Sequence, residues 1–188
     1  MTERKLKGLN FRTILAALEK QHGEDARAHV EASVTGELRQ TLEFGGILVS
    51  AWYPASWYGE LLGCIATEIG GGAQTIRGLS RDALKSDFKT VFRVMRLFFS
   101  PELAAAQSRR VAARYIDGGH IDVVSAEPGR MHYRLTEFPG YSHLMWWDFI
   151  GGVEGVLVSM GAETLSVNLL NGGQDGDDHM EFVLRWTE

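Results

Sequence analysis

The stretch 120-HIDVVSAEPGRMHYRLT-136 predicts the architecture of the second part of the chain. Apolar residues at Ile121, at Val123 and through the run 131–135 flank the turn sequence Glu-Pro-Gly at 127–129. Proline presets the backbone φ angle and glycine accepts a positive φ, so this tripeptide favours a tight turn. The stretch therefore predicts a β-hairpin.

A second hairpin is predicted further along the chain. Residues 165–170 and 180–186 are rich in apolar and β-branched side chains, and the polar segment 171–178, rich in turn-forming residues, separates them. The apolar, aromatic segment 141–160 between the two hairpins has helical character and ends before Gly161. Two hairpins joined by a helix predict a four-stranded antiparallel sheet with that helix packed on one face.

The preceding sequence is expected to be helical. Apolar residues recur at helical spacing over 11–18, with Asn10 as the expected N-cap and Gly23 as the stop. Residues 24–42 predict two short helices, because Ser33, Val34, Thr35 and Gly36 disfavour one continuous helix.

Two longer helices follow in the prediction. A helix that begins near Ala55 carries a wide apolar stripe and ends at the glycine run 70–72, so it should lie deep in the core. Residues 73–99 predict another helix, with a break near Gly78 or Ser86, and Pro101 is expected to open a further helix to about residue 115.

The fold class predicted from these patterns is α+β. With 188 residues the chain is expected to form one domain over 1–188, helical over 1–117 and ββαββ over 118–188. The one cysteine, Cys64, excludes an internal disulfide and any multi-cysteine metal site, and fits a reducing compartment. Without a signal-peptide pattern or an uninterrupted apolar span, we expect a cytoplasmic protein with no membrane span.

No catalytic motif is recognisable. The sequence has no phosphate-binding loop, no dinucleotide fingerprint and no nucleophile elbow, and its six histidines include no pair at metal-ligand spacing. We therefore expect no enzyme, no metal and no cofactor. If an undetected activity exists, His132 and His143 are the best-placed acid or base candidates.

The charge distribution suggests a surface for a partner. Residues 73–119 carry a net charge of +5 by our count of nine basic and four acidic residues, although the whole chain carries −5. Five of the basic residues recur every four positions and would form a basic ridge on one continuous helix: Arg77, Arg81, Lys85, Lys89 and Arg93. The ridge is either an anion- or partner-binding site or a solvated helix face. With a pI of about 5.7 for the chain, we expect no nucleic-acid partner.

Aromatic side chains suggest a site for a ligand. Tryptophan and tyrosine present large apolar walls with polar tips, which suits either a pocket or an ordinary core. The candidate ligand-binding residues come from two segments, 52–58 and 141–149: Trp52, Tyr53, Trp57, Tyr58, His143, Trp146 and Trp147.

Several soft motifs give the chain a family resemblance. The run 52-WYPASWY-58, the sequences 133-YRLT-136 and 151-GGVEG-155 and the closing 182-FVLRW-186 resemble a myxobacterial paralogous family of unknown function. The C-terminal half is also similar to the vinyl-reductase-type ligand-binding domain, whose fold is shared with haem nitric-oxide sensors and dimeric trafficking subunits. This resemblance implies a small-molecule pocket between helices and a twisted sheet.

Haem sensors of that fold hold iron through a histidine on a helix before the sheet and clamp the propionates with a Tyr-x-Ser-x-Arg motif. This sequence departs from both features, because no histidine lies between His29 and His120, and Tyr133-Arg-Leu-Thr-Glu137 ends in an acid. The resemblance thus favours a sensory or regulatory domain that binds a small apolar ligand without enzymatic activity. The alternative is a homodimeric protein-interaction module without a ligand.

Overall fold

The computed structural model describes residues 4–95 and 115–187, with the side chains of residues 85–95 left undescribed. The chain is α+β, as predicted. Its described helices are α1 (Gly8–His22), α2 (Glu24–Ser33), α3 (Gly36–Glu43), α4 (Ala55–Ile69), α5 (Gly72–Met95) and α7 (His143–Ser159). Its described strands are β1 (Lys5–Lys7), β2 (Trp52–Pro54), β3 (His120–Glu127), β4 (Arg130–Thr136), β5 (Glu163–Gly172) and β6 (Met180–Thr187).

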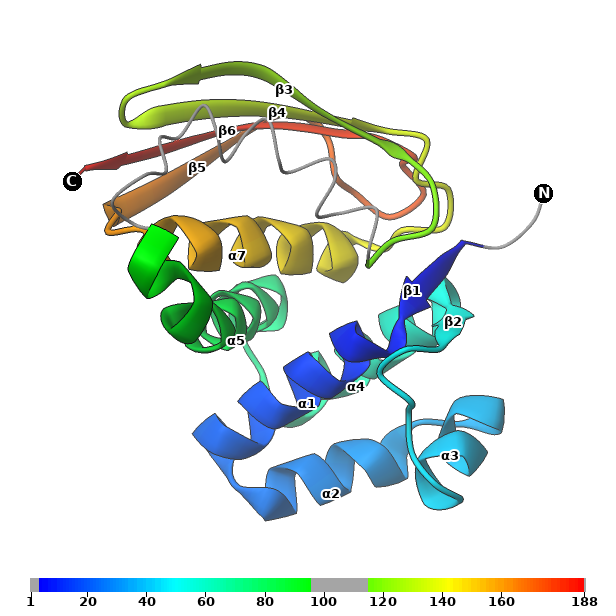
Figure 1. Ribbon diagram of the computed structural model, residues 1–188. Helices are drawn as coiled ribbons and strands as arrows, with labels where there is room; N and C mark the ends of the chain where they lie inside the picture. Colours follow the sequence, from blue (N-terminus) through cyan, green and yellow to red (C-terminus); the bar gives the residue numbers. More distant parts are fainter. Residues whose placement is uncertain (1–3, 96–114, 188) are drawn as a thin grey trace.

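The four-stranded sheet has the order β3-β4-β6-β5, and every neighbouring pair is antiparallel. Each predicted hairpin therefore forms, and the two join through β4 and β6, where Tyr133 lies opposite Phe182. Side chains alternate between the two faces of a strand, so Met131, Tyr133 and Leu135 of β4 are all buried. In Figure 1, α7 lies along one face of this sheet.

The remaining helices stack beyond α7. Figure 1 shows α5 on the side of α7 that faces away from the sheet, followed by α1 and α4 and then by α2. The α5 and α7 backbones approach very closely, because a Cβ atom built on Gly151 or Gly155 would lie within 3.0 Å of the carbonyl oxygen of Arg77 or Arg81. The two glycines of α7, spaced four residues apart, therefore set the distance between these helices.

Most predicted helices form within a few residues of their expected bounds. α2 and α3 are the two predicted short helices, and α4 begins at Ala55 and ends before Gly70, whose φ is +79°. The predicted break in the following helix is wrong, because α5 continues through Gly78 and Ser86 to Met95. A single glycine costs a helix only about 1 kcal/mol, which packing against α7 outweighs.

Two details of the first part also differ from the prediction. α1 begins at Gly8 rather than after Asn10, whose amide instead donates to the carbonyl oxygen of Tyr115. β1 and β2 form an unpredicted two-stranded antiparallel sheet, since three-residue strands leave too short a pattern to recognise. The helix expected after Pro101 lies outside the described residues.

Candidate functional site

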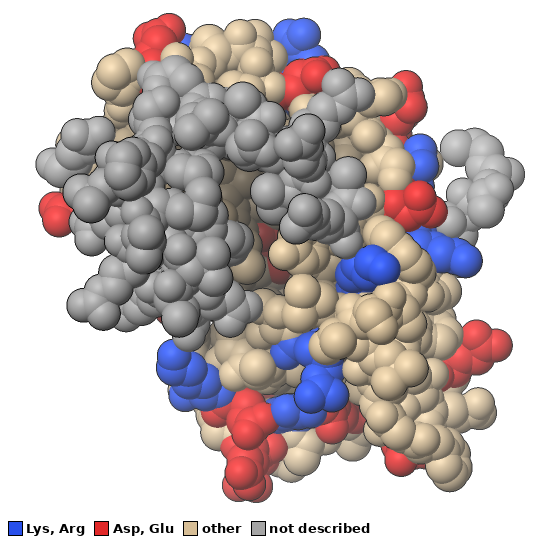
Figure 2. Space-filling view, in the orientation of Figure 1, with Lys and Arg blue, Asp and Glu red and all other residues tan. Residues whose placement is uncertain are grey.

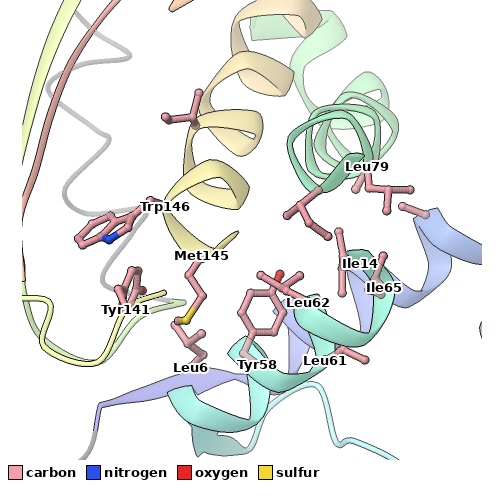
Figure 3. Close-up of a cluster of buried hydrophobic side chains, with 14 of the residues drawn as sticks. Leu6, Ile14, Tyr58, Leu61, Leu62, Ile65, Leu79, Tyr141, Met145 and Trp146 are labelled. Atoms are coloured by element: carbon pink, nitrogen blue, oxygen red, sulfur yellow. The ribbon is translucent and has the colours of Figure 1, made fainter. Parts of the chain in front are cut away.

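Aromatic and apolar side chains fill the junction between α7 and the helical first part of the chain. We call this cluster the aromatic seam: Tyr58 of α4, Phe138 and Tyr141 of the β4–α7 loop, and Met145 and Trp146 of α7, all of which are buried. In Figure 3, Met145 extends from α7 toward Leu6 and Tyr58, which belong to the first part. The seam therefore joins the helical part of the chain before residue 118 to the ββαββ part that follows it.

Three rings of the seam, those of Phe138, Tyr141 and Trp146, pack against one another in edge-to-face or tilted pairs. The centroid of Tyr141 lies 4.9 Å from that of Trp146 and 5.0 Å from that of Phe138. Phe138 and Trp146 are 5.8 Å apart with an interplanar angle of 70°. Pairs with these geometries stabilise a core beyond the area they bury. They form a rigid apolar wall beside the sheet.

One polar atom of the seam has no partner among the residues that the structure describes. Trp146 has no exposed surface, and its indole nitrogen Nε1 forms no hydrogen bond within the described part of the chain. The neighbouring Trp147 Nε1 is buried and unpaired in the same way. A buried donor without an acceptor costs roughly 1–3 kcal/mol, so such a group calls for an explanation.

A carboxyl group links three helices next to the seam. Asp148 of α7 is half-buried, and its Oδ1 accepts hydrogen bonds from Tyr58 Oη of α4, at 3.1 Å, and from Ser80 Oγ of α5. Burial raises the pKa of Asp148 from 3.8 to about 6, although both hydroxyl donors favour its charged form. Burial and the negative charge of Asp148 also raise the pKa of Tyr58 well above its usual value.

A second carboxylate of α7 is completely buried. Glu154 has no exposed surface and accepts from Nε of Arg77 at 2.9 Å and from Nη2 of the same guanidinium. The guanidinium also lies 5.5 Å from the ring centroid of Trp147. This two-point pairing satisfies a charge that would otherwise be very costly to bury.

The predicted ligand-binding residues do not converge on one place. Tyr58 and Trp146 belong to the aromatic seam, whereas Trp52 lies at the surface with Lys7 Nζ 4.2 Å from its ring. Tyr53 and Trp57 stack at 5.8 Å beside the N-terminal helix. Only a part of the predicted set therefore shares the interior of the molecule.

His143 and Trp147 lie at the start of α7, where they serve local structure. His143 Nδ1 is 3.0 Å from the carbonyl oxygen of Gly173, and its ring packs on the edge of Trp147. Asp175 Oδ1 accepts from the His143 backbone N–H, and Ser142 Oγ accepts from that of Met145. The polar loop between β5 and β6 therefore caps α7.

The predicted basic ridge is described only in part. Arg77 points inward to Glu154, whereas Arg81 is partly exposed and lies 3.8 Å from Asp82. These last two residues line a shallow hollow against Val158 and the start of β5. Lys85, Lys89 and Arg93 lie on α5, but their side chains are outside the described residues.

His132 belongs to a charged group on the sheet. Its Nε2 lies 2.7 Å from Glu181 Oε1, and Arg134 donates two hydrogen bonds to the same carboxylate. These bonds, first that of Arg134 and then that of His132, lower the pKa of Glu181. In the described residues 4–95 and 115–187, no cluster of His, Cys, Asp and Glu has the makings of a metal site.

The residues at the predicted Tyr-x-Ser-x-Arg position form no polar clamp. Tyr133 stacks on Phe182 with centroids 5.2 Å apart, and Leu135 has no exposed surface. Glu137 adopts a positive φ of +62°, and its carboxylate is 3.4 Å from His120 Nε2 at the surface. Burial alone raises the pKa of Tyr133.

Sequence reasoning missed the three polar residues that tie the helices together: Ser80, Asp148 and Glu154. A signal existed for the two acids, because each interrupts an otherwise apolar helix from 144 to 158. An acid in such a segment is either on its exposed side or paired inside, and the pattern does not distinguish them. The partners of Asp148 lie 68 and 90 residues earlier in the chain, and the partner of Glu154 lies 77 residues earlier.

Comparisons with known proteins bear on the fold. No protein-family model matches the chain, and no curated protein matches it. Within the described residues, no helix has both the length and the apolar character needed to cross a membrane.

Solved structures of H-NOX proteins match the whole chain. An H-NOX protein mutant from K. algicida superposes with a TM-score of 0.73 at 13% identity, covering 97% of both chains. An H-NOX protein from S. oneidensis gives 0.72 at 11% identity, again over 97% of both chains. The Cs H-NOX domain gives 0.71 at 16% identity over the same share of each. This chain therefore has an H-NOX-like fold.

Proposed function

We propose that the chain is a non-enzymatic sensory domain that binds a small apolar ligand at the aromatic seam. The solved proteins with this fold include the S. oneidensis H-NOX protein in an Fe(II)NO ligation state, and another is described in terms of haem redox potential. The similarity over nearly the full length supports a role in binding a small ligand, because those proteins are described in unliganded and NO-ligated states. The identity of the ligand depends on this chain's own residues.

A histidine-ligated haem does not fit these residues. No histidine occurs anywhere from residue 30 to residue 119, which includes the segment before the sheet. At the positions of the propionate-clamp motif this chain has the buried apolar Leu135 and the acid Glu137, and neither side chain could donate a hydrogen bond to a haem carboxylate. Two like charges at that place would repel each other. The proposed ligand is therefore not a haem bound in that way.

The observation that supports the proposal most directly is that Trp146 Nε1 has no partner within residues 4–95 and 115–187. Its N–H is a buried donor on a ring that packs against the rings of Phe138 and Tyr141. A mostly apolar molecule with one hydrogen-bond acceptor would satisfy this donor and pack on the surrounding rings. Ligand sites of this composition, with apolar walls and few polar groups, are common in proteins.

The first experiment identifies the ligand. The full chain, freshly purified, is analysed by native mass spectrometry and by absorbance, and extracted with organic solvent. We expect an added mass that the solvent removes. Haemin added to the extracted protein should not produce the spectrum of a histidine-ligated haem. A protein that carries no small molecule and behaves as a dimer in light scattering would favour the homodimeric interaction module instead.

A matched pair of variants tests the site. Trp146→Phe removes the N–H and keeps an aromatic ring, so occupancy by the extracted molecule should fall by about tenfold. Trp186→Phe changes a tryptophan of β6 that is also buried and lies outside the seam, and should leave occupancy unchanged. Equal occupancy of the Trp146 variant and the wild type would contradict the proposed site.

A further inference from the structure

Exposed apolar side chains gather at one end of the molecule. The described residues include seven large hydrophobic side chains that are exposed, and five of them belong to α1 or to residues 44–52 between α3 and β2. We call these five the apolar cap: Leu9, Phe44, Leu48, Val49 and Trp52. Soluble proteins rarely concentrate apolar surface in this way unless it contacts something.

The loop that carries the apolar cap is firmly held. The buried side chain of Ile47 anchors the loop in the core. Two hydrogen bonds also hold the loop: Lys7 Nζ donates to Ser50 O at 2.9 Å, and Leu9 N donates to Val49 O at 3.1 Å. Gly8 makes this approach possible, because a Cβ there would overlap the carbonyl oxygen of Leu48. The adjacent side chains are therefore presented outward by a fixed backbone.

The exposed fractions of the cap residues decrease along the loop. Phe44 is 86% exposed, Leu48 63%, Val49 52% and Trp52 38%. A backbone hydrogen bond of 3.1 Å from Ala51 N to Leu48 O closes a turn here, and the cap side chains before, within and after this turn are exposed. Exposed apolar side chains next to basic residues are a composition that binds the interface of a lipid bilayer.

Basic residues border the apolar cap. Residues 4–12 contain Arg4, Lys5, Lys7 and Arg12 and no acid, and residues 44–54 contain no charge, although the whole chain has a net charge of −5. Glu43, next to the cap, is bound to Arg39 at 2.8 Å. On the face shown in Figure 2, this end has a largely uncharged surface with both basic and acidic side chains at its border.

We propose that the apolar cap is a docking site for an anionic lipid bilayer. Phe44, Leu48 and Val49 would enter the boundary between headgroups and acyl chains, with Trp52 at the headgroup level. Lys5, Lys7 and Arg12 would lie over anionic headgroups, which attract basic groups near the surface. A second copy of this chain fits less well, because a symmetric contact would bring the same basic residues together.

The test is co-sedimentation of the full chain with vesicles. One set contains phosphatidylcholine alone, and the other contains about 30% phosphatidylglycerol. We expect the wild type to pellet with the anionic vesicles and to be released by high salt. The double variant Phe44→Ser with Leu48→Ser should bind at least about tenfold more weakly, because it removes the two most exposed apolar groups.

A matched control uses exposed apolar residues elsewhere. Val124 and Leu170 lie on the edge strands β3 and β5 and are 45% and 50% exposed, so Val124→Ser with Leu170→Ser should bind vesicles like the wild type. Equal loss in both double variants would overturn the proposal. A wild type that stays in the supernatant with anionic vesicles would also overturn it. If, in addition, the Phe44→Ser, Leu48→Ser variant self-associates less than the wild type in light scattering, the apolar cap contacts a second copy of the chain instead.

Discussion

Arg77 Nε donates to Glu154 Oε2 over 2.9 Å, and this ion pair joins α5 to α7 where Glu154 has no contact with solvent. The same α7 carries Asp148, bound to Tyr58 and Ser80, so both acids of the helix hold it to its neighbours. Polar groups buried between helices constrain their alignment, because any shift leaves a charge unpaired.

Replacing Arg77 alone should lower the free energy of unfolding much more than replacing both Arg77 and Glu154. Arg77→Met leaves the buried Glu154 carboxylate without its partner, and we expect a loss of about 3–5 kcal/mol in the free energy of unfolding. The double variant with Glu154→Met restores apolar packing and should recover most of the loss. Urea denaturation of the two single variants and the double variant measures the coupling. Additive losses would show that the two side chains act independently.

The close approach of α5 and α7 predicts a contrast between glycines. Gly151→Ala and Gly155→Ala should each lower stability by about 1–3 kcal/mol, because the new methyl group meets a backbone carbonyl of α5 that is not free to move. At Gly63 of α4, no described atom outside the helix's own backbone lies within 4 Å of the Cβ position, so Gly63→Ala should raise stability by about 0.5–1 kcal/mol. Thermal unfolding of all three variants measures these changes in stability. If Gly63→Ala and Gly155→Ala change the melting temperature in the same direction and by a similar amount, the close contact at Gly155 does not limit the approach of the helices.

The raised pKa of Asp148 predicts a pH dependence. Because burial raises its pKa from 3.8 to about 6, the folded protein binds this proton more tightly than the unfolded chain does. The stability from this group is complete below about pH 4 and is lost as the pH rises to about 6, by about 3 kcal/mol at most. Asp148→Asn should remove this contribution and should equal or exceed wild-type stability at neutral pH.

Unfolding curves measured at several pH values check the Asp148 prediction. Asp122→Asn, which changes an exposed aspartate of β3, serves as the control and should keep the wild-type slope between these pH values. If the stability of the wild type and that of the Asp148→Asn variant change equally between these pH values, the Asp148 carboxyl group does not have the raised pKa.

The charged group on the sheet predicts a coupled titration. Arg134→Ala removes the main donor to Glu181, so the pKa of that glutamate should rise toward its ordinary value. The remaining bond from His132 should keep part of the depression. Carbon-detected NMR titration of the glutamate carboxyl groups measures this directly. A Glu181 pKa that is the same in the wild type and in the Arg134→Ala variant would exclude Arg134 as the cause.

The sequence was sufficient to predict the sheet and most helices, since their signals are local. The Glu-Pro-Gly turn before β4, the strand patterns on both sides of the polar loop and the apolar stripe of α4 each depend on neighbouring residues. The strands β1 and β2 escaped prediction because their three-residue pairing depends on a partner more than forty residues away. The continuity of α5 through Gly78 depends on its packing on α7.

Only the tertiary structure decided which side chains share the interior. The sequence identified the aromatic residues of 52–58 and 141–149 without indicating that Tyr58 and Trp146 enter the seam while Trp52 stays at the surface. It also could not pair Arg77 with Glu154, because an ion pair across 77 residues leaves no periodic signal. Local patterns determine which elements form, whereas burial and pairing depend on how those elements meet in space.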